Sequence, residues 1–398
     1  MSKNDGADKT RRRRGRSPAS PASLLDDENL LWEILIRLPP QPSSLPRASA
    51  VCTRWRRLAT DPKFIACFRG HHRKPPLLGV FHRGNEGIVF VPVLDPPDRI
   101  PTERLDMRRY GKYGILGCRH GRVLAINWSQ GELIVCEPVT GEQHRVVVPD
   151  EFRGVLINGA ILCPAADDPG HVHHGGCPFK VVLMTMYADD YRPVACVYSS
   201  ETGTWGDLVK TADTCELDDA GFPGALVGNA IYWLDGREGN EILVFDLDEQ
   251  NNLAAIQGPS ITNDFRGCSR RIIKAEHGAV GFAILSYPRF QMWQRNVNCH
   301  GGATWVLWKT IEMHDIPGLP LAGRSTILGY SEDTDAFFIF VEGYVYMVQL
   351  KSMQSKRLHQ TEYIDKYHPF TSFYTPGIAI AGGHDGVESQ DTLDDSTV

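Results

Sequence analysis

The chain has 398 residues, of which 42% are hydrophobic and 23% charged, and its formal net charge at pH 7 is −6. This ordinary globular composition allows two or three domains. No stretch approaches the ~20 consecutive apolar residues of a membrane-spanning helix. Residues 1–21 lack the apolar centre of a secretory signal, and the net negative charge argues against a protein that coats nucleic acid.

Charge is concentrated at the two ends of the chain. Residues 1–16 carry seven Lys or Arg against two Asp, and residues 381–398 carry five acidic residues and no Lys or Arg. Both ends are poor in hydrophobic residues, so we expect disordered tails over 1–22 and 382–398. The basic run Arg11–Arg14 is either a nuclear address or a solvated tail.

Residues 23–72 have the pattern of three short helices. Apolar residues recur at helical spacing from about residue 27 to 38, where Pro39-Pro40 ends the first helix. A second apolar stripe runs over residues 44–59, and Phe64–Phe68 marks a third helix. So few residues form a thin core that a partner can complete. The alternative is a small helical subdomain packed on the rest of the chain.

Three motifs in this segment resemble an F-box, in the order and spacing of that family. They are a Leu-Pro element at Leu38-Pro39, then Val51-Cys52-x-x-Trp55, then Asp61-Pro62-x-Phe64. The sequence of this segment is similar to that of plant F-box proteins. F-box motifs dock on a Skp-type adaptor, which links them to cullin and RING subunits. The resemblance implies that the adaptor contacts Leu30, Ile34, Leu35, Leu38, Pro39, Leu45, Pro46, Val51, Cys52 and Trp55. On the helical stripe alone, Cys52 is predicted to be a buried small hydrophobe.

From residue 73 to 381 the pattern is all-β, with short apolar runs separated by Gly, Pro, Asn and Asp. Strands that end in a tight polar turn recur, and aligning Val135, Val197, Val244 and Val348 gives steps of 62, 47 and 104 residues. The last step, of 104 residues, has the length of two repeats, and Trp305–Trp308 lies near its middle. Steps of ~40–50 residues are typical of propeller blades, and this spacing predicts about six to seven blades. The alternative is two stacked β-domains.

Two of the repeated turns contain Thr-Gly, at Thr140-Gly141 and Thr202-Gly203. Glycine supplies the positive φ that a tight hairpin turn needs. This region resembles the kelch-like F-box-associated propellers of plants, most clearly in the segments Val197–Trp205 and Gly228–Trp233.

Two patterns could carry chemistry. The paired acids Asp189-Asp190, Asp218-Asp219 and Glu332-Asp333 lie in turn-like stretches, where solvated loop carboxylates are favoured over a hydrolase. Cysteines are scattered without a Cys-x-x-Cys pair, as in a reduced cytosolic or nuclear protein.

The best metal candidate combines a pair of cysteines with three histidines between them. Their spacing fits no compact zinc site, so we favour a polar loop between blades. These residues are Cys163, His171, His173, His174 and Cys177. We therefore predict no metal, no cofactor and no catalytic residue.

Three arginines form a further candidate group. Arg266, Arg270 and Arg271 can line one face of the propeller.

The sequence thus predicts a tail (1–22), a three-helix F-box (23–72), a propeller (73–381) and a second tail (382–398). The resemblance implies the substrate-receptor subunit of an SCF-type cullin-RING ubiquitin ligase, non-catalytic and cytoplasmic or nuclear. The propeller would bind the target protein, with no membrane partner and no expected nucleic acid. Alternatives are a propeller hydrolase or other propeller enzyme, and a nuclear binding protein that acts through its basic tail.

Overall fold

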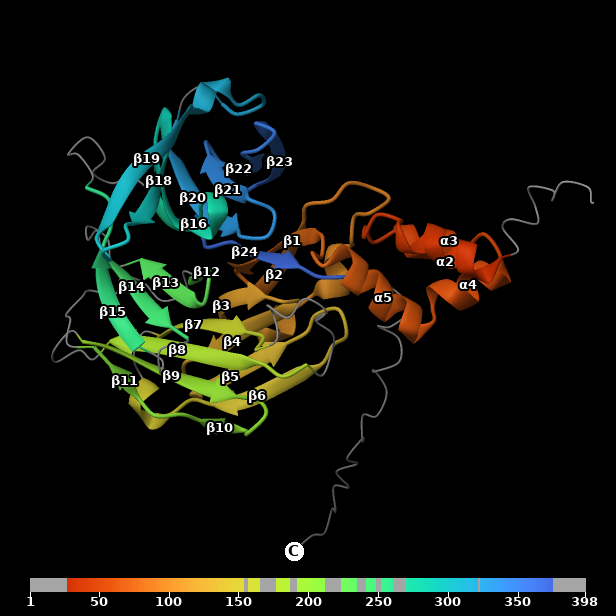
Figure 1. The fold of residues 1–398 in the computed structure, drawn as a ribbon, viewed down its shortest axis with the longest axis horizontal. Helices are drawn as coiled ribbons and strands as arrows, with labels where there is room; N and C mark the ends of the chain where they lie inside the picture. The colour runs from red at the N-terminus through yellow and green to blue at the C-terminus, as the bar shows by residue number, and fades with distance from the viewer. Residues whose placement is uncertain are drawn as a thin grey trace, which may run out of the picture.

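The computed structural model describes residues 27–153, 157–164, 177–186, 192–211, 223–234, 241–247, 252–260, 269–320 and 323–374. Within them a small helical bundle is followed by β-strands, and the bundle projects from one side of the β body (Figure 1). The α-helices are α2 (Glu28–Ile36), α3 (Ser44–Ser49), α4 (Thr53–Ala59) and α5 (Pro62–His72). The longest of these has 11 residues, and none of the described helices could cross a membrane.

Capping carboxylates set the starts of two helices in the bundle. The Asp27 side chain accepts a hydrogen bond from the backbone N of Asn29 at 2.9 Å. Asp61 accepts from the backbone N of Lys63 at 2.8 Å and of Phe64 at 3.1 Å, with Pro62 in the first turn of α5. Each cap satisfies amides that have no partner within the helix. The bundle core consists of Leu31, Leu35, Leu45, Ala48, Leu58, Ala59, Phe64 and Phe68.

The predicted second helix is two helices. The chain leaves helical geometry between α3 and α4, where Cys52 is extended (φ −163°, ψ 169°) and precedes the first turn of α4. This break lets Leu45 of α3 and Leu58 of α4 both face the core. Cys52 is exposed as a result, so the prediction that it is buried was wrong.

The β-strands of the described residues form six sheets, which are the blades of a propeller. The predicted all-β propeller of six to seven blades after a helical F-box segment is thus confirmed, with six blades described. The first blade contains β3 (Gly114–Arg119), β4 (Arg122–Asn127), β5 (Glu132–Cys136) and β6 (Gln143–Val147). The second contains β7 (Ile157–Leu162), β8 (Lys180–Met186), β9 (Pro193–Ser199), β10 (Thr204–Trp205) and β11 (Val209–Lys210). The third contains β12 (Ala225–Val227), β13 (Ala230–Leu234), β14 (Glu241–Asp246) and β15 (Asn252–Gln257).

The remaining three blades complete the ring. The fourth contains β16 (Ser269–Lys274), β17 (Val280–Ser286), β18 (Arg289–Val297) and β19 (Ala303–Glu312). The fifth contains β20 (Ser325–Ser331), β21 (Ala336–Val341), β22 (Tyr344–Gln349) and β23 (Gln354–Gln360). The sixth joins the two ends of the propeller, in the order β24 (His368–Thr371), β1 (Leu77–Gly84) and β2 (Gly87–Pro92).

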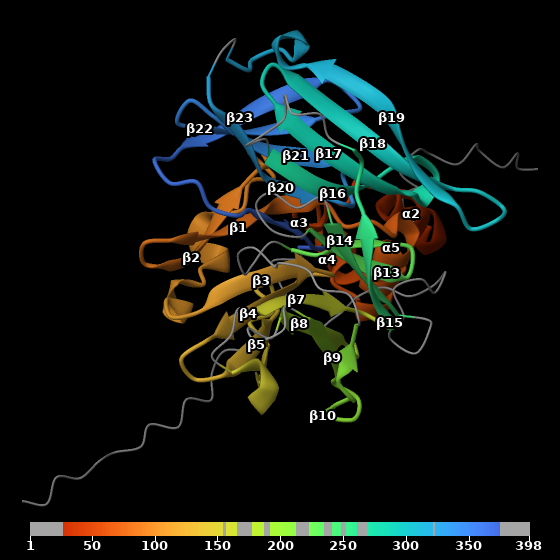
Figure 2. The same ribbon diagram turned by 90° about the vertical axis from the view of Figure 1, so that its left-hand side faces the viewer.

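The sixth blade closes the ring by pairing the last strand with the first. Strand β24 is its inner strand and lies between the inner strands β3 and β20 of the neighbouring blades (Figures 1 and 2). Beside β2, where other blades have a fourth strand, lie the 3-10 helices η1 (Thr102–Leu105) and η2 (Arg108–Tyr110). Phe81 and Phe370 pack edge to face across the closing pair, with ring centroids 5.2 Å apart.

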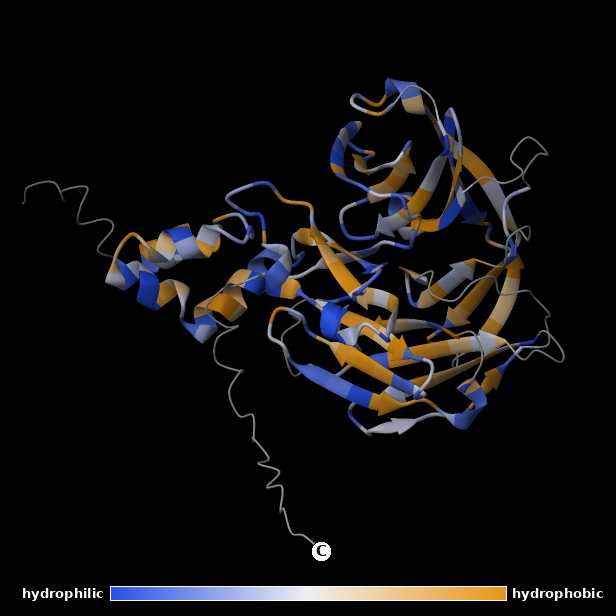
Figure 3. Ribbon diagram, turned by 180° about the vertical axis from the view of Figure 1, so that it is seen from behind, coloured by the Kyte–Doolittle hydropathy of each residue, from blue (hydrophilic) through white to orange (hydrophobic). Residues whose placement is uncertain are grey.

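The hydrophobic core is divided among the blade interfaces. Buried clusters lie between each pair of neighbouring blades around the ring. Figure 3 shows the hydrophobic residues gathered along the strands. At the interface of the fourth and fifth blades, for example, Phe290 packs edge to face on Phe337 with centroids 4.8 Å apart. Each blade therefore needs both neighbours to bury its faces.

The sequence repeat corresponds to the third strand of four of the six described blades. Val135, Val197, Val244 and Val348 lie on β5, β9, β14 and β22. The Trp305–Trp308 segment does not continue the series, because it lies on the outer strand β19 and the third strand of that blade is β18. The predicted turns are confirmed: Gly141 and Gly203 have φ of 81° and 69°.

Candidate functional site

The residues predicted to dock an adaptor divide into three groups in the structure. Leu30, Ile34 and Val51 are large apolar side chains that are 37%, 38% and 62% exposed. Leu35 and Leu45 are buried in the bundle core. Among the others, Pro39 and Cys52 are exposed, and Leu38, Pro46 and Trp55 are half-buried. Leu35 and Leu45 therefore stabilise the bundle and offer no accessible contact.

Two of the exposed apolar side chains share one face of the first helix of the bundle. Leu30 and Ile34 are four residues apart on α2 and so lie one above the other on the same face of that helix. Val51 lies in the turn between α3 and α4. We call Leu30, Ile34 and Val51 the exposed apolar set. Several large apolar side chains exposed on so small a bundle are typical of an interaction surface.

The bundle is tied to one face of the propeller. Four residues separate the end of helix α5 from the start of β1, and the backbone N of Ser43 donates to the Asp98 carboxylate at 2.9 Å. Strand β1 runs antiparallel to β24, with Leu77 opposite Thr371 and Phe81 opposite His368. The start of β1 thus lies on the bundle side of the propeller, and its far end near Arg83 lies on the opposite face.

A central channel opens on both of these faces. The bundle-side mouth is a hollow of about 230 Å³ whose lining includes Arg119, Lys274, Glu332, Asp333 and Thr371. The far mouth is a hollow of about 370 Å³ whose lining includes Arg83, Trp128, Ile364, Asp365 and Lys366. Arg271 and His368 line both hollows, and therefore lie between the two mouths.

Polar contacts at the bundle-side mouth connect the inner strands. Arg119 donates to the Glu332 carboxylate at 2.8 Å and to the carbonyl of Gly224 at 3.0 Å. The same Glu332 oxygen accepts from the backbone N of Leu226 at 2.9 Å. Asp333 accepts from the Thr371 hydroxyl at 3.0 Å. These two acids hold β3, β12, β20 and β24 together.

Only one of the three predicted acid pairs can be placed. Asp189-Asp190 and Asp218-Asp219 lie outside the described residues, whereas Glu332-Asp333 is described. Arg266 is also outside, while Arg271 of the same predicted group lines the channel. His368 was not identified from the sequence, because a single His-Pro at the start of a short strand carries no recognisable signal.

The middle of the channel holds two buried titratable side chains. Arg271 donates through Nη2 to the carbonyl of Ile327 at 3.0 Å and through Nη1 to that of Arg270 at 2.9 Å. Burial lowers its pKa to about 9. His368 is 3% exposed, and its Nδ1 makes no hydrogen bond with any described residue. Burial, together with the positive charges of Lys366 and Arg271, lowers its pKa to about 3, so it is neutral at pH 7.

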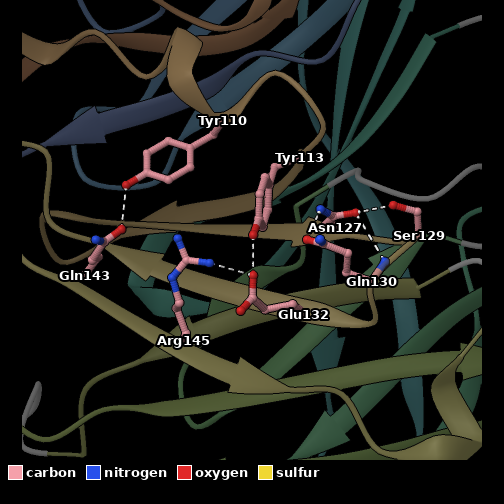
Figure 4. Close-up of polar contacts among 8 residues, drawn as sticks. All are labelled: Tyr110, Tyr113, Asn127, Ser129, Gln130, Glu132, Gln143 and Arg145. Carbon is pink, nitrogen blue, oxygen red and sulfur yellow. Dashed lines mark hydrogen bonds and ion pairs between the residues drawn. The ribbon is translucent and has the colours of Figure 1, made fainter. Parts of the chain in front are cut away.

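A second polar cluster, in the first blade, has internal partners (Figure 4). Tyr110 of η2 donates to Gln143 of β6 at 2.8 Å. Tyr113 donates to Glu132, which also accepts from Arg145 at 2.9 Å. The hydrogen bond from Tyr113 is the main cause of the lowered pKa of Glu132. These contacts attach the η2 segment of the closing blade to the first blade.

Two of the five candidate zinc ligands are among the residues that the structure describes. Cys163 and Cys177 are buried thiols. His171, His173 and His174 lie outside the described residues. Among the residues that the structure describes, no three His, Cys, Asp or Glu side chains are grouped to hold a metal ion.

Comparisons with known families give two matches that lie end to end along the chain. The F-box-like family matches residues 28–66. The family described as F-box protein AT5G49610-like, beta-propeller matches residues 114–377. No curated protein matches the sequence significantly.

Solved structures resemble the chain only distantly. They include the Dos1 propeller (10% identity, 70% of this chain and 66% of the other, TM-score 0.31). Another is the PQQ-bound aldose sugar dehydrogenase of Streptomyces coelicolor (12% identity, 69% and 91%, TM-score 0.38). A third is apo AztD of Citrobacter koseri (11% identity, 73% and 88%, TM-score 0.33). This chain spans just under two thirds of the length of the Dos1 chain. At these values no activity transfers to this protein.

Proposed function

The chain belongs to the AT5G49610-like β-propeller family of F-box proteins, and from this premise we propose that it is the substrate-receptor subunit of an SCF-type cullin-RING ubiquitin ligase. In this proposal the F-box covers residues 23–72 and docks a Skp-type adaptor. The propeller, residues 73–381, binds the target protein. The site of action is then the cytoplasm, the nucleus or both.

The observation that carries the proposal is the exposed apolar set on the helical bundle. Leu30, Ile34 and Val51 belong to the segment that matches the F-box-like family, and each exposes more than a third of its surface. Covering these side chains with a partner removes apolar surface from water, at about 25 cal/mol per Å². Their neighbours Leu35 and Leu45 face inward, so the bundle can present this set without unfolding.

The receptor role requires no catalytic group in this chain. The adaptor, cullin and RING subunits supply the ubiquitin-carrying enzyme, and the receptor contributes proximity by holding a target beside it. The Glu332-Asp333 pair fits this role, because both carboxylates are engaged by Arg119, Leu226 and Thr371 in contacts that stabilise the channel.

Co-expression with a Skp-type adaptor tests the docking claim. The double variant Leu30→Asp/Ile34→Asp should lose at least about tenfold in adaptor recovery, because two charges would be placed in an apolar interface. The matched control is Val147→Asp on β6, which changes an apolar side chain that is 64% exposed on the propeller. Adaptor recovery that is undiminished in the double variant would contradict the proposal.

A further inference from the structure

We propose that the far mouth of the channel binds an acidic peptide segment of the target, with a carboxylate entering the hollow. The inference rests on the proposed receptor function and adds the chemistry of the target. It also places the target on the propeller face opposite to the F-box, which leaves the exposed apolar set free for the adaptor.

The charges at the two mouths differ, and the difference selects the far mouth for an anion. Among the residues that the structure describes, Arg83, Arg271 and Lys366 line the far mouth against one carboxylate, that of Asp365. This carboxylate already accepts from the backbone N of Arg83 at 2.9 Å. The described lining of the bundle-side mouth also has three cationic side chains, Arg119, Arg271 and Lys274, but these stand against two carboxylates, those of Glu332 and Asp333. The excess of positive charge is therefore larger at the far mouth, which favours an incoming acid there.

Two residues that line the far mouth each contain a buried polar atom with no hydrogen-bond partner among the described residues. These atoms are Nδ1 of His368, in a side chain that is 3% exposed, and Nε1 of Trp128. An unsatisfied buried polar group is costly, and a ligand that pairs with it recovers that cost. A carboxylate accepts from the Trp128 N–H and from the Nδ1–H tautomer of His368. Arg271 places a buried positive charge at the end of the same hollow.

Exposed apolar side chains lie beside the charged hollow at the far mouth. Ile364 lines the far mouth and is 47% exposed, and the adjacent Tyr363 is 65% exposed. Exposed aromatic and aliphatic side chains next to a charged pocket are suited to an extended peptide, in which an acidic residue is followed or preceded by an apolar one. The site therefore favours a peptide over a free inorganic anion.

The test is a selection of randomised nine-residue peptides, displayed on phage, against the immobilised full-length chain. We expect the recovered peptides to share Asp or Glu at one position, beside an apolar residue. Affinities of the recovered peptides are then measured by fluorescence polarisation. Arg83→Glu/Lys366→Glu should weaken them by about tenfold or more. The matched control Lys274→Glu reverses a charge at the bundle-side mouth and should leave them unchanged.

Several results would overturn the inference. They are recovery of no peptide, recovery of peptides without a fixed acidic position, and equal weakening by Lys274→Glu. Arg83→Glu alone, with a melting curve that matches the wild type, separates loss of binding from loss of folding. Adaptor recovery measured on the same variants separates this inference from the proposed function. If the peptide selection fails while the adaptor still co-purifies, only the acidic-target inference is contradicted.

Discussion

At the level of single residues, side chains that belong to the same sequence motif differ in their exposure in the folded bundle. Leu30 and Leu35 both belong to the F-box pattern, yet Leu30 is 37% exposed and Leu35 is fully buried. A sequence pattern identifies the apolar residues of a helix, but partner-facing and core-facing positions differ only by the packing of the other helices. The role of each leucine therefore depends on the structure.

Replacing the two leucines separately should show this difference. Leu35→Ala leaves a cavity in the core and should destabilise the bundle by about 2–5 kcal/mol. Leu30→Ala should change stability by no more than about 0.5 kcal/mol. Hydrogen exchange of the α2 amides in the full chain measures both effects. Equal exchange rates in the two variants would contradict the assignment of Leu35 to the core.

The Arg119–Glu332 contact should contribute to the stability of the channel. These side chains are 13% and 23% exposed, with the charged atoms 2.8 Å apart. A double-mutant cycle with Arg119→Met and Glu332→Gln should give a coupling energy of about 1–3 kcal/mol in the free energy of unfolding. Urea denaturation of the four proteins provides the measurement. A coupling energy near zero would mean that the contact does not stabilise the inner ring.

His368 should make the stability of the propeller depend on pH. Its pKa is about 3 in the folded protein, mainly because of burial, and about 6.5 in the unfolded chain. The unfolded state therefore binds more protons between these values. Stability is fully present above pH 6.5 and falls as the pH falls toward 3, by at most ~1.4 kcal/mol per unit.

The measurement is the urea midpoint of the wild type and of His368→Asn between pH 4 and 7. The variant lacks the titrating group and should show a shallower decline. A decline of the same slope in both proteins would assign the acid sensitivity to other groups.

At the scale of the elements, the closing blade depends on one short strand. Strand β24 has four residues, and it supplies the inner position of a blade whose other strands come from the start of the propeller. Phe370 is 1% exposed and packs against Phe81 and Phe90. Distant parts of the chain are joined here, and closure removes exposed edges in the ring.

Phe370→Ala should therefore cost about 3–5 kcal/mol in the free energy of unfolding of the propeller. Leu307→Ala on β19 is the control, because its side chain is 41% exposed on an outer strand. It should change stability by no more than about 0.5 kcal/mol. Urea denaturation of the full chain compares the two. An equal cost in both variants would argue against a closing role for β24.

Some of the helices and strands could be predicted from the sequence, and others could not. Aligning Val135, Val197, Val244 and Val348 found the same strand in four blades, because a central strand has the pattern of a short continuous apolar run. Trp305–Trp308 was placed near the middle of the last step of this series, although it lies on the outer strand β19, which has apolar residues as well. The break at Cys52 was missed because both short helices keep an apolar stripe. Closure by β24 is invisible to local patterns, since its partner β1 lies almost 300 residues away in the sequence.

At the scale of the whole molecule, the two modules present separate surfaces. The exposed apolar set belongs to the helical bundle, which projects from the propeller (Figure 1). The far mouth of the channel opens on the opposite face of the propeller. The two faces are separated by about the length of β1, which has eight residues and spans ~25 Å. A scaffold that holds an adaptor and a target at once needs this separation, because the two partners must not compete for one surface.

Gel filtration with purified Skp-type adaptor, cullin and RING subunits tests whether this chain joins a ligase through its F-box. We expect a single complex that contains all four proteins and that loses only this chain when Leu30 and Ile34 are both replaced by Asp. Elution of the wild-type chain apart from an intact adaptor–cullin–RING complex would rule out the proposed receptor role.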